Sequence, residues 1–240
     1  MINISISKIS IIIPVYNERN TITSLIKRVC LTDLSLTKEI IVVDDGSTDD
    51  TRELILEIIK HQTDQNNLIK FFLHEKNMGK GAALRTGLKQ TTGDVVIIQD
   101  ADLEYPPEQY PTLIEPIIKG YADVVYGSRF LGVHRVFMFW HYFGNKILTW
   151  ITNILYNTML SDMETGYKIF TKKALENIEI KSNRFNVEPE LTAKIFKKKY
   201  LRIVEVPIAY YGRTYEEGKK ITWRDAIPAI YTLIKYRFMD

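Results

Sequence analysis

The first half of this chain repeats one pattern: a short apolar run, a polar turn, and then a segment whose apolar residues have helical spacing. The runs are rich in β-branched residues and apolar on both faces, which is typical of strands covered by helices in a parallel sheet. The predicted strands span 8–15, 39–44, 68–74, 94–100 and 123–127, and the predicted helices span 21–29, 49–60, 81–90 and 107–119. This alternation predicts a doubly wound sheet, in which ligands usually bind beyond the carboxyl ends of the strands.

The second half of the chain has a different character. Residues 135–160 are aromatic and apolar, with polar residues at roughly helical spacing, which predicts a helical insert. The insert is followed by a loop over 162–168, a helix over 189–199, a strand over 202–209, a polar turn over 212–220 and a last helix to 238. Because no Pro/Gly/Ser-rich linker or internal repeat divides the sequence, we expect a single domain over residues 1–240.

The composition is that of a globular protein, with 45% apolar and 25% charged residues. The net charge is only +3 and both signs are interspersed, which argues against an extended nucleic-acid-binding surface. A chain with a single cysteine, Cys30, cannot form an internal disulfide, and this fits a reducing compartment. No export signal is visible in the first residues, and no stretch reaches the roughly 18 apolar residues of a spanning helix. We therefore expect a cytoplasmic protein, soluble or peripheral to a membrane.

The most informative motif is the acidic segment that follows the run over 94–100. Asp100 and Asp102 stand two positions apart at the predicted carboxyl end of a strand, and Glu104 follows them. Mg²⁺ binds in proteins through one or two carboxylates together with substrate phosphates, so this pair predicts a divalent-cation site, with Glu104 as a further ligand or outer partner. The alternative is that these residues only favour the start of the next helix.

Two other strand ends carry polar side chains. Asp44 and Asp45 lead into Gly46-Ser47-Thr48, and Tyr16 and Glu18 follow the first run. Carboxylates at a strand end can accept hydrogen bonds from a nucleoside, but Asp-Gly-Ser-Thr could equally form a plain turn with Ser47 or Thr48 as a helix cap. Because parallel strands end at one edge of a sheet, we expect the three segments to face a common crevice.

A glycine-containing segment, residues 77–82, superficially suggests a phosphate-binding loop. It lacks the G-x-x-x-x-G-K-[ST] pattern, and no G-x-G-x-x-G opens the first helix, so P-loop ATPases and Rossmann dehydrogenases are disfavoured. We expect Gly79 and Gly81 to form a turn and to allow close packing of the next helix, in preference to direct contact with a ligand.

Taken in order, these motifs resemble those of family 2 glycosyltransferases with the GT-A fold. The matching segments are Ile-Pro-Val-Tyr-Asn-Glu (13–18), Val-Asp-Asp-Gly-Ser-Thr-Asp (43–49), Asn-Met-Gly-Lys-Gly-Ala-Ala (77–83), Asp-Ala-Asp-Leu-Glu-Tyr-Pro-Pro-Glu (100–108) and Gly-Ser-Arg (127–129). Within the family, the sequence from about Ile9 to Arg237 is most similar to dolichyl- or polyprenyl-phosphate sugar synthases. The resemblance implies an α/β, GT-A-like (Rossmann-like), mostly parallel sheet flanked by helices, with a C-terminal acceptor-side helical region. It also implies that residues 1–130 bind the nucleotide sugar and residues 131–240 face the acceptor and the membrane.

The resemblance implies roles for individual residues. The nucleoside positions are Pro14, Tyr16, Glu18, Val43 and Asp45, and the metal and diphosphate positions are Asp100, Ala101 and Asp102. Arg129 matches a basic residue near the donor sugar and phosphates. Arg213 and Lys219 match the basic pair of a flexible loop that closes on the donor diphosphate and the acceptor phosphate, a task suited to cationic side chains. Relatives can carry Gln where this chain has Glu104, so the resemblance supports Glu104 less than Asp102 as a metal ligand.

The implied reaction is an inverting transfer of a hexose from GDP-mannose, UDP-glucose or UDP-N-acetylglucosamine to dolichyl or polyprenyl phosphate, with Mg²⁺ or Mn²⁺ stabilising the leaving diphosphate. A lipid phosphate is already an anionic nucleophile, so Asp102, Arg129, Arg213 and Lys219 would carry the catalysis without a general base. Asp162, Glu164 and Lys168 resemble the acceptor-side loop of the family. Glu188 and Glu190 belong to a nearby segment that could equally serve as the start of a helix.

The insert also has the composition of an interfacial helix. Its aromatic residues are Phe137, Phe139, Trp140, Tyr142, Phe143, Trp150 and Tyr156. These rings could enter the headgroup layer of a membrane or pack on the core, and the last helix, with Trp223 and Ile227, allows the same two interpretations. A membrane-anchoring partner is conceivable, because some relatives carry spanning helices after the catalytic domain.

Two alternatives fit the same motifs. A transferase that extends a glycan or glycolipid hydroxyl would need a carboxylate base, for which Asp162 and Glu188 are the candidates. A non-catalytic nucleotide-sugar-binding module could keep the sheet without activity, although the acidic pair and the basic residues argue against it.

Overall fold

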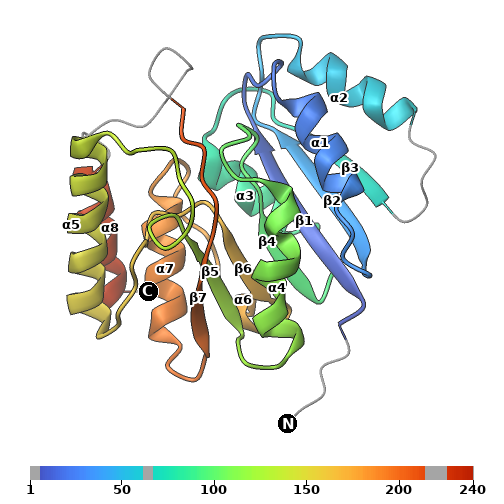
Figure 1. Cartoon of the computed structure of the whole chain (residues 1–240). Coiled ribbons are helices and arrows are strands. Elements are labelled where there is room, and N and C mark those ends of the chain that lie inside the picture. The colour runs from blue at the N-terminus through green and yellow to red at the C-terminus, as the bar shows by residue number, and fades with distance from the viewer. Residues whose placement is uncertain (1–5, 62–66, 214–225, 240) are drawn as a thin grey trace.

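The centre of the protein, here a computed structural model that describes residues 6–61, 67–213 and 226–239, is a seven-stranded sheet with the order β3-β2-β1-β4-β6-β5-β7 (Figure 1). The strands are β1 (Lys8–Val15), β2 (Thr37–Asp44), β3 (Asn67–Leu73), β4 (Val95–Ile98), β5 (Val124–Ser128), β6 (Lys168–Thr171) and β7 (Ile203–Pro207). Neighbouring strands are parallel except at β6, which is antiparallel to β4 and β5. This is the predicted α/β, GT-A-like class, a mostly parallel sheet flanked by helices.

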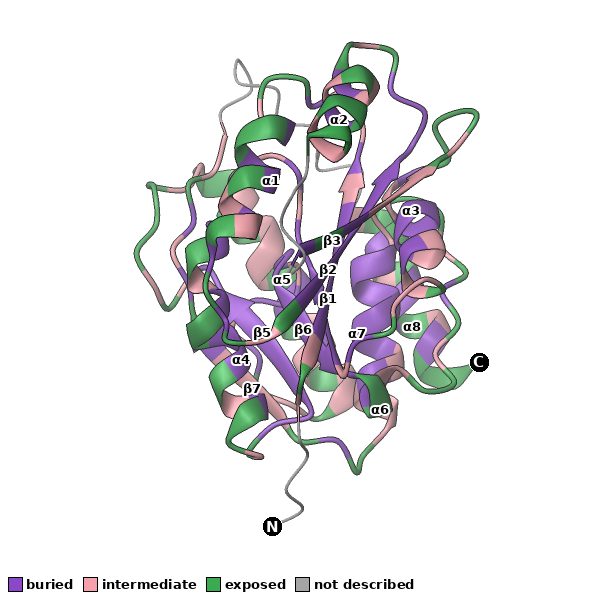
Figure 2. Cartoon of the chain, turned by 90° about the vertical axis from the view of Figure 1, so that its right-hand side faces the viewer, coloured by how far each residue is buried: buried purple, intermediate pink, exposed green. Residues whose placement is uncertain are grey.

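Helices cover both faces of the sheet. They are α1 (Ile22–Leu31), α2 (Thr51–Lys60), α3 (Lys80–Leu88), α4 (Tyr110–Ile118), α5 (Phe139–Tyr156), α6 (Lys172–Leu175), α7 (Val187–Lys197) and α8 (Ala226–Phe238), with a short 3-10 turn at Pro107–Gln109. The core on one face joins the strands to α1, α2 and α4, and the core on the other face joins them to α3, α5, α7 and α8. Figure 2 shows the central strands buried between these layers.

The side chains of β1 explain why its run is largely apolar. Ile9, Ile11 and Ile13 pack in the core under α1 and α4, while Ile12 points to the opposite face and packs in the core that contains Leu84 of α3. All four isoleucines are fully buried. Ser10 is buried as well, and its hydroxyl donates to the Glu39 carboxylate at 2.6 Å, so both faces of the strand are covered, which confirms the prediction of a helix-covered sheet.

The structure corrects several sequence-based boundaries. The predicted loop ends at Lys168 and no element is predicted over 169–171, but residues 168–171 form β6, which inserts as the antiparallel strand between β4 and β5. β4 already ends at Ile98, so Asp100 lies in the turn beyond the strand. Helix α2 begins at Thr51, and neither Ser47 nor Thr48 caps it; the Asp49 carboxylate instead accepts a hydrogen bond from the Thr51 backbone N–H. The insert is helical only from Phe139.

Helix α5 forms the outermost layer of the second half, where it packs against α8 and α7 (Figure 1). Its outward side exposes large rings, with Phe139 65%, Trp140 77% and Trp150 65% exposed. Their packing on the core, one of the two interpretations of the sequence, is therefore excluded, whereas Phe137 does pack partly against it. Among the helices of the described residues, none combines the length and apolarity needed to cross a bilayer.

Candidate active site

The carboxyl ends of β1, β2 and β4 meet at one edge of the sheet. β1 pairs in parallel with both β2 and β4, and Val15, the last residue of β1, lies opposite Asp44. The loops after β1 and β2 are joined by a hydrogen bond from the Asn17 backbone N–H to the Ser47 hydroxyl. The acidic segments after the three strands therefore share one edge, as expected.

The two aspartates after β2 serve different local functions. Asp44 is buried, accepts a hydrogen bond from Ser47 N and pairs with Arg52. Asp45 accepts hydrogen bonds from the backbone N–H groups of Met78 (3.0 Å) and Gly79 (2.6 Å). Its Oδ1 also lies 2.7 Å from Nδ1 of His74. Asp45 thus fixes the 77–79 loop beside the shared edge of the sheet, a contact that sequence spacing did not reveal.

The glycines of that loop are needed for close packing, as predicted. Gly79 has φ of +98°, a conformation that favours glycine. A Cβ atom at Gly79 would collide with the backbone oxygen of Asn183, and one at Gly81 would collide with that of Ser182. The start of α3 can therefore lie directly against the segment that precedes α7.

The acidic segment after β4 makes a tight turn. Leu103 has φ of +63°, unusual for a leucine, and the Glu104 backbone N–H donates to Asp102 Oδ1 at 3.1 Å. Burial, and then the charges of Asp100 and Glu104, raise the pKa of Asp102 to about 8. Backbone strain and crowded carboxylates often occur at functional sites, and a cation would offset the repulsion among these carboxylates.

Arg213 joins two of the strand ends. Its guanidinium binds the Glu18 carboxylate (Nη2 to Oε2, 3.0 Å) and donates to the backbone oxygen of Asp102 (2.6 Å). Its backbone N–H donates to the Glu104 carboxylate at 2.7 Å, and the Tyr210 hydroxyl donates to the other oxygen of Glu104 at 2.5 Å. These hydrogen bonds and the ion pair bring together segments that are more than 100 residues apart in the sequence.

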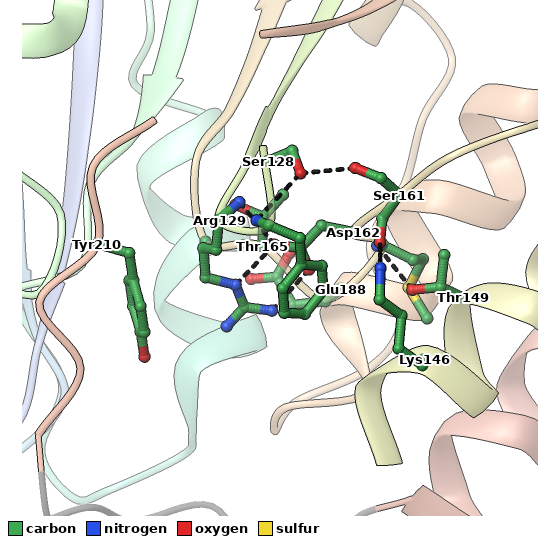
Figure 3. Close-up of polar contacts among 12 residues, drawn as sticks. Ser128, Arg129, Lys146, Thr149, Ser161, Asp162, Thr165, Glu188 and Tyr210 are labelled. Atoms are coloured by element: carbon green, nitrogen blue, oxygen red, sulfur yellow. Dashed lines mark hydrogen bonds and ion pairs between the residues drawn. The ribbon is translucent and has the colours of Figure 1, made fainter. Parts of the chain in front are cut away.

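Arg129 is held at the end of β5 by a two-pronged ion pair with Asp162 (Figure 3). Both bonds are 2.7 Å long, and Asp162 also accepts the Arg129 backbone N–H. The guanidinium carbon lies 5.3 Å from the centre of the Tyr210 ring and 5.7 Å from that of Phe130. The position of Arg129 therefore depends on both the 162–168 loop and the strand end.

Lys80, at the start of α3, is another member of the site. Its ammonium lies 2.6 Å from Asp100 and 2.8 Å from Glu188, and Glu188 in turn pairs with Lys168 at 2.6 Å. Burial would lower the pKa of Lys80, but the two carboxylates outweigh it and raise the pKa, so the lysine stays charged. The sequence motif contains Lys80, but its pattern predicts a role only for the two glycines.

The carboxylates fit a divalent cation only in part. Asp102 is crowded by like charges that a cation would offset, and Asp100 stands beside it. The expected third ligand, Glu104, bonds instead to Tyr210 and Arg213. Within residues 6–61, 67–213 and 226–239, no three or more His, Cys, Asp or Glu side chains form a metal-binding group. The three-carboxylate set expected from the sequence is therefore not assembled here.

Four further expected site residues belong to the ends of β1 and β2 or to the turn after β4, and one lies outside the described residues. Pro14 and Tyr16 are half-buried at the tip of β1, while Val43 and Ala101 are buried behind the strand ends. Lys219 lies outside the described residues.

A mostly parallel sheet whose strand ends gather carboxylates and arginines is typical of α/β proteins that bind ligands at this edge. The sequence profile of the family described as glycosyl transferase family 2 matches residues 10–179. The chain therefore belongs to glycosyl transferase family 2, which confirms the resemblance and the class of enzyme predicted from the motifs.

Individual relatives agree with this membership. The chain is 32% identical to a dolichol-phosphate mannosyltransferase of Pyrococcus furiosus, over 95% of this chain and 64% of the relative, so it spans just under two thirds of that protein. Crystal structures of glucosyl-3-phosphoglycerate synthase from Mycobacterium tuberculosis share the fold. One holds Mn²⁺, UDP and glucosyl-3-phosphoglycerate (TM-score 0.71, 21% identity) and another holds Mg²⁺ and UDP (TM-score 0.71, 20% identity). Both cover 98% of this chain, which itself covers 81% of each.

Proposed function

We propose that this protein transfers a hexose, with inversion, from a nucleotide-diphosphate sugar to a polyprenyl phosphate of the dolichyl type. The observation that carries this proposal is that Asp162 and Glu188, the two candidate bases for a hydroxyl acceptor, are both held in ion pairs. The Arg129 guanidinium binds both oxygens of the Asp162 carboxylate, and the Glu188 carboxylate lies between the ammonium groups of Lys80 and Lys168. Burial would raise the pKa of Glu188, but the lysines lower it to about 2, far below that of a base effective near neutral pH. A lipid phosphate needs no base, because it is already an anion.

The donor would bind across the shared edge of the sheet. The nucleoside would lie at Pro14, Tyr16, Glu18, Val43 and Asp45, and the diphosphate at the segment Asp100-Ala101-Asp102. Asp102, with Asp100 beside it, would hold Mg²⁺ or Mn²⁺, which supplies electrostatic stabilisation of the leaving diphosphate when bound. We omit Glu104 from the ligands because its oxygens are engaged by Tyr210 and Arg213.

The basic residues would bind the remaining phosphate charge. Arg213 reaches the acidic turn from the segment that follows β7, and Lys219 would act beside it. Arg129 lies against the 162–168 loop, which we assign to the acceptor phosphate together with Arg129 itself. In this proposal residues 1–130 bind the donor and residues 131–240 provide the acceptor side.

The relative and the solved structures support different parts of this assignment. The name of the Pyrococcus relative supports mannose as the sugar and a dolichol phosphate as the acceptor. The mycobacterial structures show that the same fold accommodates UDP.

A transfer assay with GDP-mannose, UDP-glucose and UDP-N-acetylglucosamine, each with Mn²⁺ and a short polyprenyl phosphate, tests the proposal. Absence of a lipid-linked sugar with every donor would contradict it.

Glu164 favours a second candidate, transfer to a hydroxyl acceptor. Among the residues that the structure describes, its Oε1 is buried without a hydrogen-bond partner, and burial raises the pKa of Glu164 to about 7, near the ideal for a general base. Such a base works only when ionised, so transfer to a hydroxyl would fall as the pH drops below about 7.

The substitution Glu164→Gln separates the two acceptors. A base for a hydroxyl acceptor would lose roughly 10²- to 10⁴-fold in kcat in the variant. With polyprenyl phosphate we expect a change of at most about threefold, because no proton has to be removed. The measurement is kcat with each acceptor, with Glu108→Gln, in an exposed pair with Arg28, as the control. A loss of a hundredfold on polyprenyl phosphate would contradict the phosphate-acceptor mechanism.

We further propose that α5 contacts the surface of the membrane that holds the lipid acceptor. Trp140 and Trp150 are largely exposed, and Lys235 and Arg237 stand at the end of the neighbouring α8. Interfacial helices combine exposed aromatic side chains with basic residues in this way.

Replacing both tryptophans, Trp140→Ser/Trp150→Ser, is expected to weaken binding to anionic phospholipid vesicles by roughly tenfold or more, because two large rings no longer enter the apolar layer. Cosedimentation with vesicles measures this. The control is Tyr121→Ser, which removes a ring that is 66% exposed next to α4. Equal binding of the double variant and the unaltered protein would exclude α5 as the contact.

A further inference from the structure

A row of four alternating charges runs from the acidic turn into the protein. Asp100 pairs with Lys80, Lys80 with Glu188, and Glu188 with Lys168, at 2.6, 2.8 and 2.6 Å. The four side chains come from the turn after β4, from α3, from α7 and from β6, and none is more than 19% exposed. Lys168 ends the row by donating to the backbone oxygen of Thr165 at 2.5 Å.

This row leaves little of the Asp100 carboxylate available. Its Oδ1 is bound by Lys80, and its Oδ2 lies so close to Gly166 that a Cβ atom there would collide with it. Because the Glu104 carboxylate is likewise bound by Tyr210 and Arg213, protein groups already engage two of the three carboxylates of the acidic turn.

We propose that Lys80 is a positioning residue that acts as an internal counter-cation, competing with the divalent metal for Asp100 so that the metal binds tightly only together with the donor diphosphate. This inference rests on the proposed function, since it takes Asp100 and Asp102 as the metal and diphosphate site. The phosphate charges then add the attraction that the neutralised carboxylates lack.

Glu188 makes this exchange feasible. A buried ammonium that lost its only carboxylate would be strongly destabilised. Lys80 keeps Glu188 at 2.8 Å when Asp100 turns to a metal ion, so it is not left unpaired. Without the charge of Glu188, Lys80 would be held by Asp100 alone and would compete more strongly with the metal.

The proposal predicts opposite effects of two neighbouring substitutions on Mn²⁺ binding to the nucleotide-free protein. Lys80→Met removes the competing cation and should tighten binding by roughly tenfold or more, the scale of one unit charge at a few ångströms. Glu188→Gln, made together with Lys168→Met so that no buried ammonium is left without its carboxylate, should weaken it by about threefold or more, because Lys80 then holds Asp100 more firmly. Electron paramagnetic resonance of free Mn²⁺ during titration measures both. If the row were only structural, both substitutions would weaken binding by disturbing Asp100.

Controls separate this effect from misfolding. Lys119→Met removes a lysine from an exposed pair with Glu115 and should leave Mn²⁺ binding unchanged. Lys80→Gln removes the charge of Lys80 but keeps a polar amide in the row and leaves the Glu188–Lys168 pair intact, so it too should bind Mn²⁺ more tightly than the unaltered protein. It serves if Lys80→Met alone does not fold, as judged by thermal unfolding. Addition of GDP or UDP should reduce the differences in Mn²⁺ affinity between the variants and the unaltered protein.

The outcomes distinguish this inference from the proposed function. If the unaltered protein binds Mn²⁺ with nucleotide but the folded lysine variants bind it no more tightly, the role of Lys80 is wrong while the metal site stands. If no Mn²⁺ binds even with GDP or UDP present, both the inference and the metal part of the proposed function are overturned.

Discussion

Asp102→Asn is expected to reduce sugar transfer by roughly 10³-fold while leaving the protein at least as stable. The loss follows because an amide cannot supply the negative charge that would hold a divalent ion against the leaving diphosphate, and such electrostatic stabilisation is a large part of catalysis. The measurement is kcat with polyprenyl phosphate and saturating Mn²⁺. Retention of most of the activity would contradict the assignment of Asp102.

The same substitution is expected to leave the stability of the protein unchanged or to increase it. Burial and the charges of Asp100 and Glu104 raise the pKa of Asp102 to about 8, so the folded state disfavours the ionised form. In the unfolded chain the group ionises near its ordinary value, so ionisation favours unfolding at pH 7. Asparagine does not ionise, so this contribution to unfolding disappears, and the melting temperature should stay the same or rise. Asp33→Asn, at an exposed loop position, is the control and should change neither quantity.

The parts of the site that local sequence encodes were predictable. Each strand end was marked by an apolar run that gives way to polar residues, so the chain positions of Asp45, Asp100 and Asp102 followed from the pattern alone. Their placement at one edge followed from the rule that parallel strands end together.

The contacts between distant segments were not predictable. The bonds of Arg213 to Glu18 and to the oxygen of Asp102 join residues 195 and 111 positions apart, and no local pattern marks them. Strand β6 was missed for a related reason, because it has only four residues and begins with a lysine. Lys168 can be buried there only because Glu188, on α7, neutralises it.

These distant contacts explain why residues with the right chemistry can have other tasks. Glu104 had the side chain and the position of a metal ligand, but Tyr210 and Arg213 reach it from the other half of the chain. Glu188 was a candidate base, but two lysines from separate elements lower its pKa to about 2. Such neighbours decide whether a carboxylate binds metal, accepts a proton or supports another side chain, and single-sequence motifs do not specify them.

Arg129→Met is expected to lower stability by about 3–5 kcal/mol, together with a loss of transfer. The substitution leaves Asp162 buried and without its guanidinium partner, and an uncompensated buried charge is strongly destabilising. Denaturant unfolding measures the stability, and kcat at a temperature where the variant is folded measures the transfer.

The double variant Arg129→Met/Asp162→Asn separates the two roles of Arg129. Asparagine removes the unpaired charge but can still accept the hydrogen bond from the residue 129 backbone N–H, which Asp162 accepts at 3.0 Å. We therefore expect it to regain a large part of the stability lost in Arg129→Met. Transfer should remain low, because the cation proposed to bind the donor and acceptor phosphates is still missing. Recovery of transfer together with stability would show that Arg129 only supports the fold, and the proposed phosphate contact would then be wrong.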